Sequence, residues 1–166
     1  MKHVKHRMKI VFPVIVLLFI LCSMKLYSQA TAVNRDPLQI YKQAELHFIQ
    51  EQYSLALPLL LELKQEVQSH TLVHHAIRLE DLDYYLLACR LQQNDSRAEA
   101  PAADFIDFTS NPPRTRQLSF HLANYFFKRQ QFEQAAGYYE RTGIEVLDNN
   151  QIATYKFRLA YSYFTL

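Results

Sequence analysis

The chain has 166 residues, of which 49% are hydrophobic, and a formal net charge of +2 at neutral pH. It contains two glycines, Gly137 and Gly143, where about twelve would be usual at this length. Tight hairpin turns often need glycine, and long runs without Gly or Pro favour helix. The composition therefore excludes a mostly β protein, and we expect an all-α fold.

The first thirty residues differ from the rest of the chain. Four basic residues lie within the first nine positions, and an apolar stretch of thirteen residues follows at 10–22. A helix that spans a bilayer needs about twenty residues. Ser28, Gln29 and Ala30 then supply the small residues that a signal peptidase recognises. This pattern predicts a signal peptide, residues 1–30, that is cleaved after Ala30. The alternative is an uncleaved anchor that continues through Leu26.

The basic charge of the chain belongs mostly to this leader. Residues 31–166 contain thirteen Lys and Arg against sixteen Asp and Glu, which gives a net charge of −3. A domain of that charge has no compositional support for nucleic-acid binding. Cys89 is the only cysteine after the leader, so we expect no internal disulfide there.

Capping residues and apolar spacing predict helices along the rest of the chain. Asp36 and Pro37 suit the N-cap and first position of a helix, and Ser54 can cap a second helix that runs to about Gln68. A third helix is expected at 73–93. For the fourth, either Ser96 and Glu99 form a capping box or Pro101 is the first helical residue. A break is expected at 109–113, and the fifth helix follows it and runs to 129. The sixth helix is expected at 132–141. The seventh runs from about 151 to the end, and the polar residues 148–150 before it are its capping candidates.

A small residue recurs at a fixed distance in three of these segments. It is followed twelve positions later by an alanine in the pairs Ala44 and Ala56, Ala88 and Ala100, and Ala123 and Ala135, and a fourth unit starts at Ala160. Helices that cross closely need a small side chain at the crossing. We expect an α-solenoid of antiparallel helix pairs in residues 31–166, with units at about 37–70, 73–113, 114–147 and a partial unit at 150–166.

The third unit carries the motif Leu122-Ala123-x-x-Phe126 and then Ala135-x-x-x-Tyr139, and Leu87-Ala88-x-x-Leu91 and Pro112 follow the same pattern in the second. These motifs resemble the tetratricopeptide repeat (TPR). Together with the leader, the segments 105–112 and 155–164 are similar to the N-terminal part of large exported bacterial cell-envelope TPR proteins. The resemblance implies a scaffold in the periplasm or cell envelope that binds a protein or peptide. It also implies a groove along the first helices of the pairs.

The positions of several aromatic residues relative to the small residue of each unit predict that their rings lie along this groove. The candidate groove residues are Tyr41, Phe48, Tyr85, Phe120, Asn124, Phe127, Phe157 and Tyr161. Large rigid rings contribute much of the binding energy at such surfaces. The alternative is that the rings pack between neighbouring helices. Asn124 directly follows the small residue of its unit. Glu45 and Cys89 occupy the same position in the first and second units, and the corresponding groove positions carry no Lys or Arg. A clamp for the C-terminal carboxylate of a chaperone is therefore not expected.

No other cluster in the sequence predicts chemistry. His70, His74 and His75 lack further ligands at suitable spacing, so we expect surface histidines and no metal or cofactor. No catalytic set can be assembled, and we do not expect an enzyme. The alternatives are a ligand-sensing or glycan-contacting module and, less favoured, a hydrolase whose catalytic part follows Leu166. The last helix lacks a polar capping face, so we also expect further repeats after it or a partner that covers it.

Overall fold

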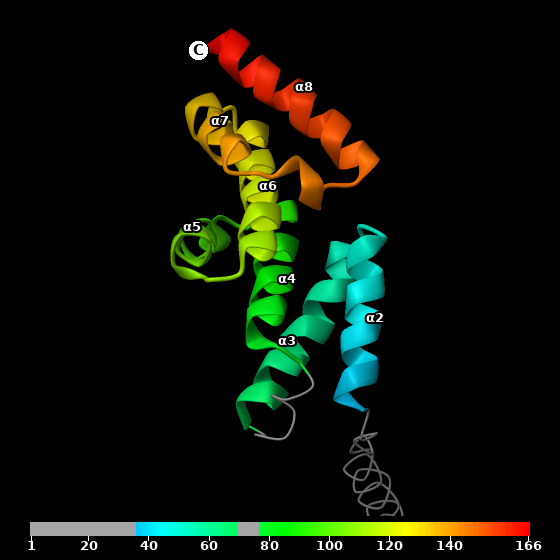
Figure 1. Ribbon diagram of the computed structural model, residues 1–166. Coiled ribbons are helices and arrows are strands. Elements are labelled where there is room, and N and C mark those ends of the chain that lie inside the picture. Colours follow the sequence, from blue (N-terminus) through cyan, green and yellow to red (C-terminus); the bar gives the residue numbers. More distant parts are fainter. Residues whose placement is uncertain (1–35, 70–76) are drawn as a thin grey trace, which may run out of the picture. The chain divides into compact units, whose positions relative to one another are not determined.

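The computed structural model describes residues 36–69 and 77–166, in which all regular secondary structure is helical (Figure 1). The helices are α2 (Pro37–Ile49), α3 (Tyr53–Ser69), α4 (Leu79–Gln92), α5 (Glu99–Phe108), α6 (Pro112–Lys128), α7 (Phe132–Glu140) and α8 (Asn149–Thr165), with short 3-10 turns η2 (Ser96–Ala98) and η3 (Ile144–Val146). The predicted all-α class is confirmed for these residues. The predicted signal segment, its cleavage site and the three clustered histidines lie outside them. Within them, no helix has the length and hydrophobicity needed to cross a membrane.

Two helix starts follow the capping signals of the sequence. Asp36 caps α2 by accepting a hydrogen bond from the Leu38 amide at 3.1 Å, and Pro37 is the first helical residue. Asp148 caps α8 by accepting from the Gln151 amide at 2.9 Å, while the Gln151 side chain accepts from the Asp148 amide. Both helices therefore begin within two residues of the predicted position.

Two other helices begin elsewhere than predicted. Ser54 is the second residue of α3 and does not cap it, because the carbonyl of Gln52 accepts the first amide bonds of that helix. The helix expected at 73–93 starts at Leu79, although residues 70–76 lie outside the described part. Arg78 has extended backbone (φ −75°, ψ 127°), and Glu80 and Asp81 occupy the first turn, where acidic side chains interact favourably with the helix dipole.

The segment between α4 and α6 also departs from the prediction. The proposed capping box of Ser96 and Glu99 is not formed, since Asp95 caps the η2 turn by accepting from the Arg97 amide at 3.1 Å. Pro101 is the third residue of α5 and not the first. The predicted break at 109–113 is shorter, because Asn111 caps α6 and the two prolines after it are the first helical residues.

The first helix of each predicted pair ends in the same turn. Glu51, Asn94 and Gln130 have φ values of 58°, 60° and 60°, and each is the second residue after its helix. In every case the next amide bonds back to a carbonyl five residues earlier: Gln52 to His47, Asp95 to Arg90, and Gln131 to Phe126. This is the Schellman motif, which usually has glycine in the left-handed position. The same turn therefore occurs three times with a residue other than glycine in the left-handed position, although glycine is the residue by which such a turn is recognised in a sequence.

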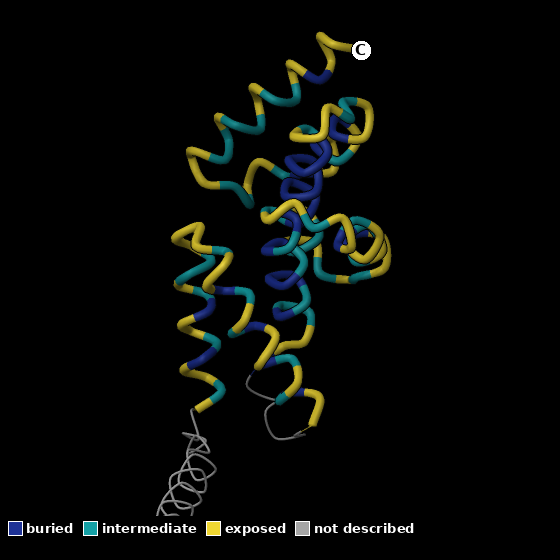
Figure 2. Tube along the Cα trace, turned by 180° about the vertical axis from the view of Figure 1, so that it is seen from behind, coloured by how far each residue is buried: buried dark blue, intermediate teal, exposed yellow. Residues whose placement is uncertain are grey.

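The helices pack in chain order. Each of α2, α3, α6 and α7 packs against the helix that follows it, and α4 packs against α6 as well as α5. Figure 2 shows that burial is concentrated on α4 and α6. All nine residues from 118 to 126 are buried, whereas Ser162 is the only buried residue of α8. The core of the described residues is thus built around α4 and α6.

The small residues at the helix crossings are mostly those expected. Ala44, Ala56, Ala88, Ala123 and Ala135 are completely buried. Ala100 and Ala160, however, are exposed. In the second pair the buried small residues are Ala98 and Ala102 instead. The cause is the η2 turn, which precedes α5 and shifts its register relative to the other pairs.

Candidate binding cleft

Two adjoining cavities form one cleft beside the core helices. Their volumes are about 200 and about 190 Å³, and they share the lining residues Glu51, Tyr53, Phe120, His121 and Gln151. The turn between α2 and α3 forms one wall, and η3 with the start of α8 forms the other (Figure 1). Side chains of α4 and α6 form the floor. We call the cavity nearer Arg114 the first and the one nearer Arg158 the second.

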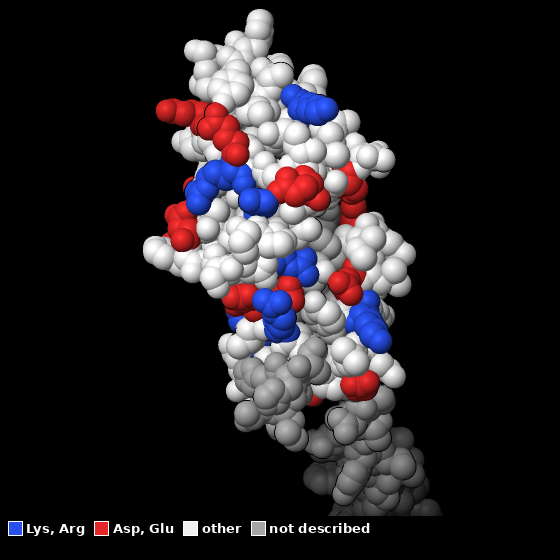
Figure 3. Space-filling view, in the orientation of Figure 1, with Lys and Arg blue, Asp and Glu red and all other residues white. Residues whose placement is uncertain are grey.

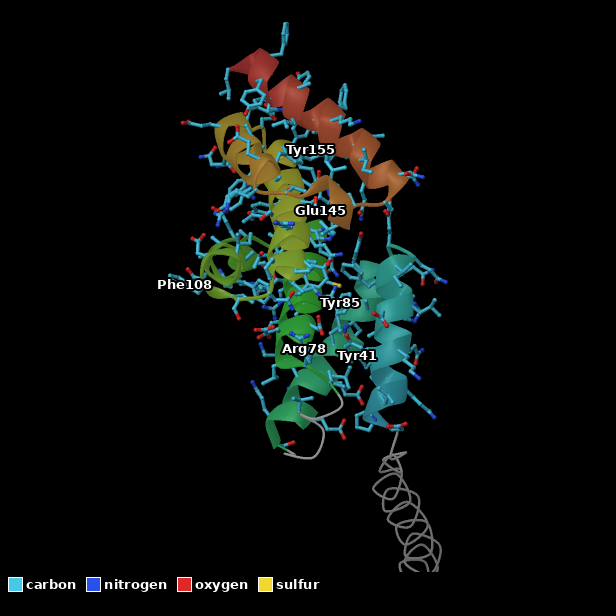
Figure 4. The ribbon with its side chains drawn as sticks, in the orientation of Figure 1. Tyr41, Arg78, Tyr85, Phe108, Glu145 and Tyr155 are labelled. Carbon is cyan, nitrogen blue, oxygen red and sulfur yellow. The ribbon has the colours of Figure 1, made fainter. Side chains whose placement is uncertain are left out.

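Packed aromatic rings form the floor of the first cavity. The Phe48 ring lies edge-on to Tyr85, with centroids 4.8 Å apart, and also contacts Tyr53, Tyr84 and His121. Tyr41 of α2 and Tyr85 of α4 also pack edge-on, with ring centroids 6.1 Å apart (Figure 4). Tyr85 and Phe120 are only 5% and 4% exposed. Much of this predicted aromatic surface is therefore used for packing between helices, as in the alternative interpretation of the rings.

Arg114 is the central charged group of the first cavity. Its Nε donates to Asp81 Oδ1 at 2.5 Å and its Nη1 to Gln117 Oε1 at 3.0 Å. The guanidinium carbon lies 4.6 Å from the Tyr84 ring centroid and 4.9 Å from that of Tyr85, within cation–π range. Arg114 could not be identified from the sequence, because its acidic and aromatic partners lie on α4, more than 25 residues away.

The tyrosines around Arg114 are neutral. The Tyr85 hydroxyl donates to Glu45 Oε1 at 2.8 Å, and burial together with this bond raises the Tyr85 pKa. Burial and the nearby carboxylates Asp81 and Glu45 raise the pKa of Tyr41 to about 12. The phenols in this part of the cleft therefore stay protonated at physiological pH.

A hydrogen-bonded chain leads from the second cavity into the core. Lys128 Nζ donates to Gln92 Oε1 at 3.2 Å, and Gln92 Nε2 donates to His121 Nδ1 at 2.8 Å. The other ring nitrogen of His121 lies 3.4 Å from the Tyr84 hydroxyl. Burial and the positive charge of Lys128 lower the pKa of His121 to about 4. His121 is consequently a neutral structural acceptor at physiological pH.

Asn124 positions a second basic residue in the same cavity. Its Oδ1 accepts from the Tyr139 hydroxyl at 2.6 Å and from Arg158 Nη1 at 2.7 Å. Arg158 also lies over the Phe127 ring, 5.2 Å from its centroid. Lys128 and Arg158 both line the second cavity. They lie five positions after Ala123 and two before Ala160, outside the positions at which groove residues were expected from the repeat, so the sequence does not predict them as groove residues.

The structure separates the predicted groove residues into two groups. Phe48, Tyr85, Phe120 and Asn124 line the cleft, and Tyr41 contacts it through Tyr85. The other three, Phe127, Phe157 and Tyr161, line neither cavity. Phe127 and Tyr161 pack with Phe132 at 5.6–5.7 Å, and Phe157 is 66% exposed beside Tyr161.

A third cavity of about 520 Å³ lies between α3, α4 and α5. Its lining is mainly apolar and includes Leu61, Leu87 and Phe108, the last of which is 84% exposed (Figure 4). The Lys64–Asp83 ion pair at 2.7 Å lies at this cavity. The cleft is the better candidate for a specific site, because it has more polar lining groups, whereas Lys64 and Asp83 of the third cavity neutralise each other.

The residues that the structure describes contain no cluster of three or more His, Cys, Asp or Glu that could hold a metal ion.

Comparisons of the chain with protein-family models, curated proteins and solved structures give no match.

Proposed function

We propose that residues 31–166 form a TPR-like α-solenoid segment that acts as an interaction scaffold and binds an extended stretch of a protein partner in the cleft. The observation that carries this proposal is the composition of the cleft. Most of its lining comes from α2, α4, α6 and α8, the first helices of four successive units, and the rest from Tyr53 of α3, the turn before it and the segment from η3 to α8. In a solenoid such a surface serves as an extended binding face.

The repeated turn supports the solenoid part of the proposal. The Schellman turns at Glu51, Asn94 and Gln130 each join the first helix of a pair to the second. The second helix of each pair then packs against the first helix of the next, as α3 does on α4 and α7 on α8. A chain whose units contact mainly their sequence neighbours has the organisation of a repeat protein.

The cleft favours a polypeptide over a sugar. A glycan-contacting module stacks sugar rings on exposed aromatic faces, but Tyr85 and Phe120 are almost fully buried. The groups that remain available are polar: amide, hydroxyl and basic side chains that suit a peptide backbone and its side chains. Acidic and basic residues are interspersed on the face shown in Figure 3, which does not favour a nucleic acid.

No catalytic or cofactor role is part of this proposal. Arg114, the basic residue of the first cavity, is paired with Asp81, and the neutral Tyr85 hydroxyl donates to Glu45. The leader at residues 1–30 leads us to propose export to the periplasm or cell envelope.

A bulky side chain in the cleft tests the proposal. Peptides are selected from a random display library on the full chain, and their binding is then measured with Thr154→Trp and Lys156→Trp. Thr154 lines the second cavity, whereas Lys156, two residues later on α8, is exposed and lines neither cavity. We expect Thr154→Trp to lose at least tenfold in affinity and Lys156→Trp to bind as the unsubstituted chain does. Equal binding by both folded variants would place the peptide elsewhere and contradict the proposal.

A further inference from the structure

We propose that the second cavity binds one carboxylate of the partner through Lys128 and Arg158, so that the cleft selects a peptide with an acid at a fixed position. This inference rests on the proposed function and names the chemistry of its partner. The carboxylate can come from an Asp or Glu side chain or from a C-terminus, since all present the same group.

The two basic side chains are held by neutral partners. Lys128 donates to the Gln92 amide oxygen and Arg158 to the Asn124 amide oxygen. Among the described residues, neither lies within 4.0 Å of a carboxylate, although Arg114 on the same helix as Lys128 is paired with Asp81. Amide oxygens orient these cations without neutralising them, which leaves their charge available to an anion.

The two positive charges also repel each other. Burial lowers the pKa of Lys128 and the positive charge of Arg158 lowers it further, while Glu51 offsets part of this shift. A like charge in a shared, partly desolvated cavity disfavours the charged state of Lys128, and an anion placed between the two side chains removes this penalty. A bound carboxylate would therefore raise the Lys128 pKa.

The site is ordered before any ligand arrives. Asn124 is buried and held by the Tyr139 hydroxyl, and it fixes Arg158 above the Phe127 ring. The Gln92 amide is held by His121 and orients Lys128. Since these side chains lose little freedom on binding, less of the interaction energy is spent on ordering them.

The net charge of the side chains that line the second cavity indicates that this cavity binds one anionic group of the partner. Lys128 and Arg158 contribute two positive charges, Glu51 one negative charge, and His121 is neutral. One further carboxylate brings the second cavity to neutrality. The first cavity differs, because Glu51 and Asp148 outnumber Arg114 among its charged lining residues. We therefore assign the carboxylate of the partner to the second cavity.

Three pools of synthetic hexapeptides test this inference. All are N-acetylated and carry random uncharged residues at five positions. The first has a fixed Glu and an amidated C-terminus, the second a fixed Gln and a free C-terminal acid, and the third a fixed Gln and an amidated C-terminus. Retention of each pool by the immobilised full chain is quantified by mass spectrometry. We expect the first or second pool to be retained at least tenfold more than the third, and the pool that binds identifies the source of the carboxylate.

Charge-matched variants assign the binding to the two cations. We expect Lys128→Met with Arg158→Met to lose the preference, and Arg129→Met with Lys156→Met, which removes the same charge outside the cavity, to keep it. Because Arg158 also packs on Phe127, two milder changes are included. Lys128→Met alone should weaken the preference, and Thr154→Glu, which supplies an internal carboxylate, should abolish it, whereas Thr154→Gln should not.

Three results would overturn the inference. If all three pools are retained equally and Thr154→Trp removes their binding, the cleft binds peptide without selecting an acid, and only the inference fails. If no pool is retained by a chain that binds library-selected peptides in the cleft, the inference again fails alone. Retention of the acidic pools that is unchanged in folded Lys128→Met and Thr154→Glu variants would place the anion site elsewhere.

Discussion

Arg114 and Asp81 form an ion pair between α6 and α4, with Nε and Oδ1 2.5 Å apart and side chains that are 21% and 17% exposed. The pair joins the two helices that form the core of the described residues. It also holds the guanidinium over Tyr84 and Tyr85, at the floor of the first cavity. The packing of the core and the shape of the cleft thus depend on the same contact.

Removal of this pair is expected to destabilise the fold. Arg114→Met leaves Asp81 partly buried with only Arg78 near it, at 3.9 Å, so we expect a loss of about 2 kcal/mol or more in the free energy of unfolding. Arg116→Met, on the same helix, removes an exposed pair with Glu145 and should cost less than about 1 kcal/mol. Urea unfolding followed by circular dichroism gives both values. Equal losses in the two variants would show that the buried pair has no special role.

The corrected register of α5 predicts opposite outcomes for two neighbouring alanines. Ala102 is completely buried, so Ala102→Leu should overpack the core and cost about 1–3 kcal/mol. Ala100 is exposed, and Ala100→Leu should change stability by less than about 0.5 kcal/mol. Thermal or urea unfolding of the two variants measures both changes in stability. A larger loss for Ala100→Leu would instead support the register expected from the twelve-residue spacing.

The left-handed turns predict that glycine stabilises the chain. Gln130 has a φ of 60°, which costs a residue with a side chain about 1 kcal/mol relative to glycine. We expect Gln130→Gly to raise the free energy of unfolding by about 0.5–1 kcal/mol. Gln134→Gly, in the first turn of α7, should lower it by up to about 1 kcal/mol. If Gln130→Gly destabilises as much as Gln134→Gly does, the turn at Gln130 is not left-handed.

The buried His121 predicts a loss of stability on acidification. Its folded-state pKa of about 4 lies below the value of about 6.5 for an unfolded chain, so the unfolded state binds the proton first as the pH falls. The contribution of His121 is therefore complete above about pH 6.5 and decreases by about 1.4 kcal/mol per pH unit down to about pH 4. His121→Gln should remove this dependence. Parallel stability curves for the two proteins between pH 7.5 and 4.5 would contradict the assignment.

Local signals in the sequence were sufficient for the helices whose caps are close to them. Asp36 accepts from the Leu38 amide and Asp148 from the Gln151 amide, both within three residues, so the starts of α2 and α8 could be predicted. The start of α5 could not, because the η2 turn capped by Asp95 competes with the capping box expected at Ser96.

The cleft was less predictable than the helices. Register identified Phe48, Tyr85, Phe120 and Asn124 among its lining residues, but spacing alone does not distinguish a ring on a groove from one packed between helices. Lys128 and Arg158 could not be assigned to one site from the sequence, because they meet only through the packing of α8 beside α6 and α7.

Site-specific photocrosslinking tests the central claim most directly. A photoreactive benzoylphenylalanine replaces either Thr154, inside the cleft, or Lys156, outside it, in the full chain expressed in cells that make the protein. If the cleft holds a polypeptide partner, irradiation gives a defined protein adduct from position 154 that is weaker or absent from position 156. No adduct from position 154, or equal adducts from both positions, would contradict the claim that the cleft is a binding site for protein.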